Sequence, residues 1–306
     1  MNKGLPILMI VIFMSCNQVP PTETENVTPD EAISTSIKSL NAKLVDAAKT
    51  KSFDKVAEFY EDDAILLAEY NPLIDGKKSI REFYTQLFDR QNITDYQKET
   101  KELFHFTNTV LEIGEFTKTC DNDVQNGKYW NYWEKKDDGN LTLIAEAFGF
   151  NHPIEDPTPL RISSIQDTTL GLSTRNNKEI PIELAAYDAM NENIVRDRDT
   201  KKVINAYTED GAYYPFASPA KVGREELSKH YHDYHAGPVK IDSVEVWTYD
   251  FHLVDDGVIK YTKFYVDWTV PDFSGNTQGT GIIYYKRQPD NSLKIYRQIG
   301  LHILNQ

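Results

Sequence analysis

Residues 55–64, KVAEFYEDDA, decide the fold, because residues 202–211, KVINAYTEDG, repeat them 147 positions further along the chain. The identical pairs in this ungapped register are Lys55/Lys202, Val56/Val203, Tyr60/Tyr207, Asp63/Asp210, Pro72/Pro219, Gly76/Gly223 and Tyr84/Tyr231. A second block matches at an offset of 152, in Gly127/Gly279, Tyr132/Tyr284, Asp138/Asp290 and Leu141/Leu293. The chain therefore contains two copies of one unit, and the second copy has gained five residues between the blocks.

Each copy passes from helical to strand-like patterns. In the first copy, Thr28 opens a capping box, and Ile33, Ile37, Leu40 and Leu44 follow at helical spacing. Two shorter helices are expected next, and from about residue 103 to 150 the chain turns to strand-like runs that end in a hairpin. The pattern predicts three helices followed by an antiparallel sheet, which is an α+β domain.

The repeat sets the expected domain organisation. We expect a first domain over residues 30–153 and a second over residues 180–306. The proline-rich stretch between them, residues 154–179, is the expected connector, with a strand or two of its own. In residues 261–269 apolar side chains fall on both faces of the strand, so this sheet is expected to be covered on both sides, with the sister sheet on one of them.

These features resemble the SnoaL-like branch of the nuclear transport factor 2-like superfamily. The resemblance is carried by the Tyr-x-x-Asp turn at Tyr60 and Tyr207, by the glycine that opens the third helix, and by the final aromatic hairpin. It implies two cone-shaped domains, each a curved sheet wrapped around helices over a pocket. Members commonly pair sheet to sheet, so a tandem chain would be a covalent pseudo-dimer and a monomer in solution.

The start of the chain has the order of an export signal. Lys3 is followed by an apolar stretch over residues 5–13, and residues 13–16, FMSC, resemble the lipobox of bacterial lipoproteins. The resemblance implies that residues 1–15 are removed and that Cys16 is lipidated, which would place the protein in the cell envelope, as an outer-membrane lipoprotein. An ordinary signal peptide with an incidental cysteine is the alternative. Residues 16–29 are expected to be a disordered tether.

Composition excludes some classes of partner. The formal net charge is −14, and loss of Lys3 with the signal would make it −15. This balance argues against nucleic acid and against a basic membrane-binding face, so membrane contact is expected through the lipid alone. Cys120, the only other cysteine, is expected to be a buried apolar residue.

Comparison of the two copies indicates where a site could lie. Five positions on presumed inward stripes change from apolar to polar in the second copy: Leu40/Tyr187, Leu44/Asn191, Phe83/His230, Leu87/Tyr234 and Ala145/Arg297. A core does not tolerate such changes without partners or water. We therefore expect a filled first domain and a ligand-sized pocket in the second. The candidate ligand-binding residues are Tyr187, Asn191, Tyr213, His230, Tyr231, Tyr234 and Arg297. The alternative is a polar core network in which these groups satisfy one another.

The resemblance also bears on catalysis, because the superfamily includes ketosteroid isomerases, polyketide cyclases and dehydratases. The position of the usual isomerase base falls on Ala68 in the first copy and Pro215 in the second, so that base is missing. His230 remains as a possible base, Tyr187 as a possible donor, and Asp267 as a strand carboxylate of undetermined facing. Asp267 could equally pair with Lys263 on the sheet surface.

No metal or cofactor is expected. His230, His232 and His235 lie close in sequence, but on a helix the three side chains cannot converge on one point. Three functions remain open at this stage. The first is a lipid-anchored module that binds a small, partly aromatic or anionic molecule; the second is an isomerase, cyclase or dehydratase with a histidine base; the third is a ligand-free interaction scaffold.

Overall fold

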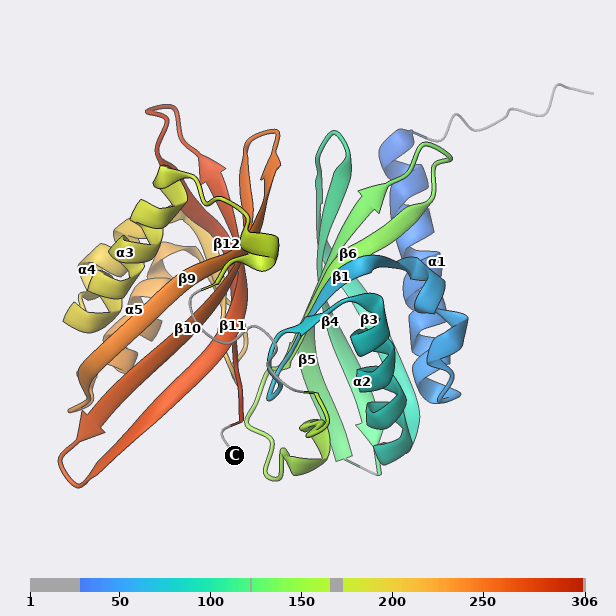
Figure 1. Cartoon of the computed structure of the whole chain (residues 1–306), viewed down its shortest axis with the longest axis horizontal. Coiled ribbons are helices and arrows are strands. Elements are labelled where there is room, and N and C mark those ends of the chain that lie inside the picture. The colour runs from blue at the N-terminus through green and yellow to red at the C-terminus, as the bar shows by residue number, and fades with distance from the viewer. Residues whose placement is uncertain (1–27, 122, 166–172, 305–306) are drawn as a thin grey trace, which may run out of the picture.

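The computed structural model describes residues 28–121, 123–165 and 173–304, which form two domains of helices and one sheet each (Figure 1). The helical elements of the first domain are α1 (Pro29–Lys49), the short 3-10 turns η1 (Phe53–Lys55) and η2 (Ala57–Phe59), and α2 (Lys77–Arg90). Its strands are β1 (Tyr60–Ala68), β2 (Ile74–Asp75), β3 (Ile93–His105), β4 (Thr109–Cys120), β5 (Asp123–Lys135) and β6 (Leu141–Phe150).

The second domain repeats this order. Its helices are α3 (Ile182–Asp197), α4 (Thr200–Ala206) and α5 (Gly223–Ala236). Its strands are β7 (Tyr207–Tyr214), β8 (Lys221–Val222), β9 (Lys240–Val254), β10 (Gly257–Val270), β11 (Phe273–Arg287) and β12 (Leu293–His302). The expected second helix is therefore a true helix only in this copy, since the first copy has η1 and η2 in its place.

Both sheets have the same topology. The strand orders are β2-β1-β6-β5-β4-β3 and β8-β7-β12-β11-β10-β9. The strands expected to be antiparallel pair as expected, and β1/β6 and β7/β12 add one parallel pair to each sheet, so both sheets are mixed. The parallel pairs arise at β1 and β7, which follow the second helical element directly and pair with the last strand of their domain.

The backbone confirms the repeat in detail. Gly76 and Gly223, which open α2 and α5, have φ of 84° and 79°, values that a side chain would oppose. Tyr70 and Ala217, also 147 positions apart, are both non-glycine residues with positive φ, at 73° and 47°. The turn before the third helix is thus the same structure in both copies.

The two sheets pack against each other in the middle of the molecule, and the helices lie on the outside (Figure 1). One buried cluster joins them. From the first sheet it includes Ile65, Leu111, Trp130 and Tyr132, and from the second Tyr214, Ile259, Tyr261, Tyr284 and Ile299. The chain is therefore an α+β pseudo-dimer with a hydrophobic core between its sheets, as expected.

The connector adds polar contacts between the domains. Its described parts contain the short turns η3 (Thr158–Leu160) and η4 (Arg175–Asn177), and they contain none of the strands expected there. The guanidinium of Arg175 lies between Asp75 of the first domain and Asp250 of the second. The expected signal peptide, the Cys16 lipidation site and nearly all of the tether lie outside the described residues. Among the described helices, none is both long and apolar enough to cross a bilayer.

Candidate functional site

The second domain contains a cavity of about 570 Å³ between its helices and the helix-covered face of its sheet. Residues from α3, α4 and α5 line one side. On the sheet side, β9 and β10 contribute the apolar residues Ile241, Val244, Val246, Phe264, Val266 and Trp268. The sheet also contributes polar lining residues, which are Tyr207, Tyr213, Thr262, Thr277, Gln298 and His302. A volume of this size lies in the range of sites for small organic molecules.

The cavity exists because small side chains replace large ones. Strand pairing aligns the copies here, since Phe116 faces Gly127 on β4/β5 as Phe264 faces Gly279 on β10/β11. In both copies the phenylalanine ring covers the glycine, and a Cβ there would lie 2.1 Å or 2.4 Å from the ring. The same register matches Tyr96 with Val244, Lys98 with Val246 and Lys118 with Val266. Three long side chains of the first copy are thus valines in the second.

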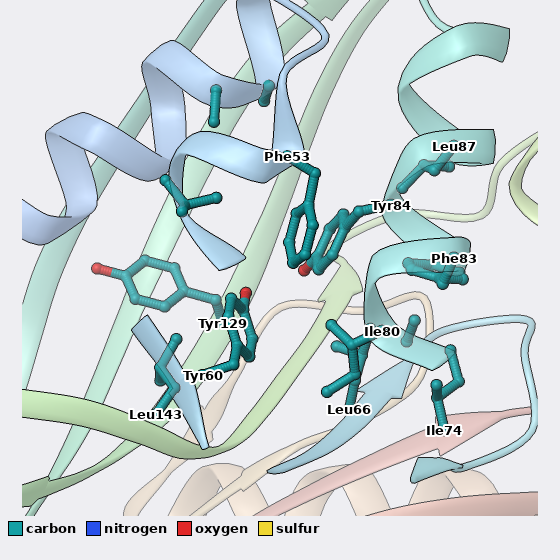
Figure 2. Close-up of a cluster of buried hydrophobic side chains, with 14 of the residues drawn as sticks. Phe53, Tyr60, Leu66, Ile74, Ile80, Phe83, Tyr84, Leu87, Tyr129 and Leu143 are labelled. Carbon is teal, nitrogen blue, oxygen red and sulfur yellow. The ribbon is translucent and has the colours of Figure 1, made fainter. Parts of the chain in front are cut away.

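The corresponding space in the first domain is occupied by side chains. Phe53 lies between the helical elements and the sheet and stacks on Tyr84, with ring centroids 5.0 Å apart and planes at 16° (Figure 2). Its counterpart at the offset of 147 is Thr200, which has no ring. Nζ of Lys98 lies 3.9 Å from the ring centroid of Tyr129. These side chains take up space that the corresponding side chains of the second domain leave open.

Hydrogen-bonding groups gather at one place in the cavity wall. The hydroxyl of Tyr207 donates to Oε1 of Gln298 at 2.6 Å and lies 3.0 Å from the hydroxyl of Tyr231. Because the single proton of Tyr207 goes to Gln298, Tyr231 is the donor in the second bond. The amide nitrogen of Gln298 remains available, since no described residue accepts a hydrogen bond from it. We call Tyr207, Tyr231 and Gln298 the polar triad.

The first domain has the same triad with one difference. Tyr60 and Tyr84 donate to Oε2 of Glu146 at 2.6 Å and 2.7 Å, so a carboxylate stands where the second domain has the Gln298 amide. Burial is the main cause that raises the pKa of Tyr207 and of Tyr231. The polar triad of the second domain is therefore uncharged at neutral pH, and it offers N–H donors rather than a closed carboxylate.

His230 lies in the cavity wall among aromatic rings. Its ring centroid is 5.1 Å from that of Tyr231 and 5.6 Å from that of Tyr213. Burial, and then the positive charge of Lys221, lower the pKa of His230, so the imidazole is neutral at pH 7. None of the described residues that line the cavity is an aspartate or glutamate, and Arg198 is the one lysine or arginine among them. Arg198 donates to the backbone oxygens of Tyr234 and Gly237, so part of its guanidinium is already used.

Five of the seven ligand-binding candidates line the cavity: Asn191, Tyr213, His230, Tyr231 and Tyr234. Arg297 does not, and the expectation that it enters the pocket was wrong. It lies between the sheets, where its Nε donates to both carboxylate oxygens of Glu102 in the first domain at 3.0 Å. Its counterpart Ala145 also belongs to the core between the sheets, so the inward face at this position is the face toward the sister domain.

Tyr187 and Asp267 also lie outside the cavity lining. The hydroxyl of Tyr187 accepts a hydrogen bond from the backbone N–H of Leu293 at 2.7 Å, which ties α3 to β12. Asp267 lies on β10 between Val266 and Trp268, which line the cavity, so its side chain points to the opposite face. There Asp267 accepts hydrogen bonds from Ser243 and Tyr265. The proposed donor and carboxylate therefore lie outside the cavity that His230 lines.

The sequence reasoning missed Gln298, Tyr207 and the valines of the sheet. The signal was present in the repeat, because Gln298 aligns with Glu146 at the offset of 152. A comparison that looks for apolar-to-polar changes does not find Gln298, because its counterpart Glu146 is already polar, and the cavity comes mainly from positions that became small. His230 and His235 line the cavity and His232 does not. In the described part of the chain, no three histidine, cysteine, aspartate or glutamate side chains are grouped as metal ligands would be.

The sequence matches no protein-family model and no curated protein. Among solved structures it is similar to a ketosteroid isomerase-like protein from Erwinia carotovora atroseptica SCRI1043, with 19% identity and a TM-score of 0.36 over 40% of this chain and 98% of that chain. A protein from Catenulispora acidiphila in complex with S-DNPA is 16% identical, with a TM-score of 0.36 over 39% of this chain and 90% of that chain. A domain of unknown function with a cystatin-like fold from Nostoc punctiforme PCC 73102 is 15% identical, with a TM-score of 0.35 over 40% of this chain and 79% of that chain. Both halves share one strand order and one placement of helices, so the chain folds as two tandem α+β domains of the same topology.

Proposed function

We propose that the protein binds one small, largely apolar molecule in the cavity of its second domain. The observation that carries the proposal is the cavity itself, about 570 Å³ in volume, with valine, isoleucine and aromatic walls. Burying apolar ligand surface against such walls is favourable by about 25 cal/mol per Å². The first domain, whose corresponding space is filled, acts as the structural partner.

The residues of the cavity wall indicate which chemical class of ligand the cavity would bind. A cationic group would find no carboxylate in the cavity lining, and Arg297, the anion clamp expected from the sequence, is paired with Glu102 elsewhere. The polar triad offers the neutral amide N–H groups of Gln298, which suit a carbonyl, hydroxyl or ether oxygen. We infer an uncharged, partly aromatic ligand with one oxygen acceptor directed at Gln298.

A binding titration tests the proposal. N-phenyl-1-naphthylamine, a neutral apolar fluorophore, should bind the wild-type protein with one site per chain and a rise in emission. Val244→Tyr, which restores the residue of the first copy, should weaken this binding by about tenfold or more, because the ring occupies the ligand's space. Val222, which is 53% exposed and outside the cavity lining, provides the control as Val222→Tyr. Equal binding by all three proteins would refute the proposal.

Catalysis is not part of this proposal. A general base needs a substrate proton within reach and a partner that stabilises the developing charge. His230 is neutral and accessible, but the described cavity wall holds no acid beside it. We therefore place binding before the isomerase or cyclase alternative.

We further propose that the protein is anchored to the cell envelope through a lipid on Cys16. The support is the order of residues 1–16 alone: a positive residue, an apolar stretch and a cysteine after a small residue. Cys16→Ala should move the protein from the membrane fraction to the soluble fraction. Retention in the membrane fraction, in a strain where the parent is also membrane-bound, would contradict the anchor.

A further inference from the structure

One end of the cavity wall is built against the first domain. The loop between β7 and β8 carries Pro215 and Phe216, and both residues line the cavity. The backbone oxygens of Pro215 and Ser218 in this loop accept hydrogen bonds from Nζ of Lys128, which lies on β5 of the first domain. A residue outside the second domain therefore holds part of its cavity wall.

The side chain of Lys128 is held in one position by hydrogen bonds. Its side chain is buried, and its third N–H donates to the backbone oxygen of Phe150 at 2.8 Å. All three ammonium protons therefore have carbonyl acceptors. The carboxylate of Glu69, also buried, lies nearby and accepts from the backbone N–H of Phe150 at 2.9 Å. The other titratable groups that act on this pair are Tyr70, on Glu69, and Lys221, on Lys128.

A second contact reaches the same wall through Tyr70. Its backbone N–H donates to the oxygen of His302 at 2.8 Å, and its ring meets Phe216 edge to face with centroids 5.7 Å apart. His302 lines the cavity and stacks on Phe216, with centroids 4.2 Å apart and planes at 7°. Both residues at this end of the cavity thus contact Tyr70 of the first domain, Phe216 through its ring and His302 through its backbone oxygen.

The contact has no mirror image. At the offset of 152, Lys128 corresponds to Thr280, and at the offset of 147, Glu69 corresponds to Phe216. A threonine cannot place an ammonium on the opposite loop, so the second domain does not hold the first domain's loop in this way. The contact runs in one direction, and so does the difference between the interiors. The first domain, whose interior is filled, supports the second domain, which has the cavity.

We propose that Lys128 is a positioning residue for the ligand site, so that the first domain sets the affinity of the second. It acts by holding the Pro215–Phe216 wall in the position that the ligand contacts. This inference rests on the proposed function, because it concerns the same cavity. It assigns the first domain a role beyond that of a structural partner.

The test is a titration of full-length variants with N-phenyl-1-naphthylamine. Lys128→Met should weaken binding by about fivefold or more, because the loop loses two charge-assisted hydrogen bonds. Lys118→Met is the matched control, since Lys118 is also a buried lysine of the first domain but donates to Gln91 in that same domain. It should bind within about twofold of wild type at a temperature where both variants are folded.

A double-mutant cycle separates positioning from general loss of stability. If Lys128 acts through Phe216, Lys128→Met should cause no further loss in a Phe216→Ala background. Equal losses from Lys128→Met and Lys118→Met, or an additive loss in the Phe216→Ala background, would overturn the proposal. Lys128→Gln, which retains two N–H donors, replaces Lys128→Met if the latter does not fold, and failure of both to fold assigns Lys128 to stability alone and also overturns it.

The outcomes distinguish this inference from the proposed function. Probe binding that is insensitive to Val244→Tyr ends the proposed function. Binding that responds to Val244→Tyr but not to Lys128→Met leaves the cavity as a ligand site and removes only the role of Lys128.

Discussion

Arg297 of the second domain and Glu102 of the first form a two-oxygen ion pair between the sheets, with Nε of Arg297 3.0 Å from each carboxylate oxygen. The hydroxyl of Tyr214 donates to the same carboxylate at 2.9 Å. The arginine side chain is 8% exposed, so the pair is largely removed from water. Arg297 replaces Ala145 of the first copy, and its side chain stabilises the contact between the two domains.

We expect Arg297→Met to destabilise the protein by about 2–4 kcal/mol, because it leaves Glu102 half-buried without its cation. The free energy of unfolding from urea titration measures this. Binding of N-phenyl-1-naphthylamine should not change, since Arg297 is outside the cavity lining. Lys202→Met, which removes the surface pairs of Lys202 with Asp197 and Asp199, is the control and should cost less than about 1 kcal/mol. A large loss of probe affinity in Arg297→Met would contradict the assignment of this residue.

His302 predicts a dependence of stability on pH. Burial lowers the pKa of His302 to about 4, below the ordinary value of 6.5. The unfolded chain therefore binds a proton more readily, and the contribution of His302 is complete above pH 6.5 and lost as pH falls toward 4. The full loss corresponds to about 3 kcal/mol.

His302→Phe keeps a ring against Phe216 and removes the titration. The difference in free energy of unfolding between the variant and wild type should shift in favour of the variant as pH falls from 6.5 to 4. Taking this difference cancels the carboxylates that titrate in the same range. A difference that is constant with pH would show that His302 is protonated freely in the folded protein.

Gln298 should select for an oxygen acceptor on the ligand. Wild-type protein should bind 2-acetylnaphthalene about tenfold more tightly than naphthalene, because the ketone oxygen accepts from the amide N–H. Gln298→Glu should remove this preference, since a carboxylate would accept from Tyr207 and Tyr231 as Glu146 does from Tyr60 and Tyr84. Equilibrium dialysis measures both ligands.

The charge introduced by Gln298→Glu is controlled by Gln288→Glu, because Gln288 is outside the cavity lining and its side chain donates to the backbone oxygen of Lys286 at the end of β11. That variant should retain the wild-type preference. Equal affinity of wild-type protein for the ketone and the hydrocarbon would exclude hydrogen bonding by Gln298 to the ligand.

The protein should be monomeric once its N-terminal segment is removed. The face of each sheet that the helices leave open is already covered by the sister sheet within one chain. Light scattering of a chain that begins at residue 28 should give the mass of one copy. A mass of two copies at micromolar concentration would require a second interface.

The repeat made most of the fold predictable, and the parts that were not predicted have physical reasons. The run Ala64–Ala68 is apolar without alternation, because β1 is buried on both faces, and such a run cannot be told from a helix end by its period. β3 begins at Ile93, ten residues before the expected start. This early part was not predicted because the edge strand is largely exposed and carries little apolar pattern. The parallel pairing of β1 with β6 is a long-range feature that local pattern does not contain.

The candidate site was predictable in part for a related reason. Positions on helix α5 had one buried face, so Phe83/His230 and Leu87/Tyr234 were assigned to the cavity side correctly. A strand in the middle of this molecule has two buried faces, one toward the helices and one toward the sister sheet. The position held by Ala145 in the first copy and Arg297 in the second lies on such a strand. Sequence periodicity alone cannot say which of the two buried faces it belongs to.

Joining two domains in one chain has a consequence for how their contact can diverge. In a homodimer with twofold symmetry, every substitution at the interface appears twice, and any contact it makes is made again on the other side. Here Lys128 reaches the loop at Pro215 while its counterpart, Thr280, is free to differ. In a single chain each domain can change without the same change in the other. One domain can therefore carry the ligand site while the other supports the loop that forms part of its wall.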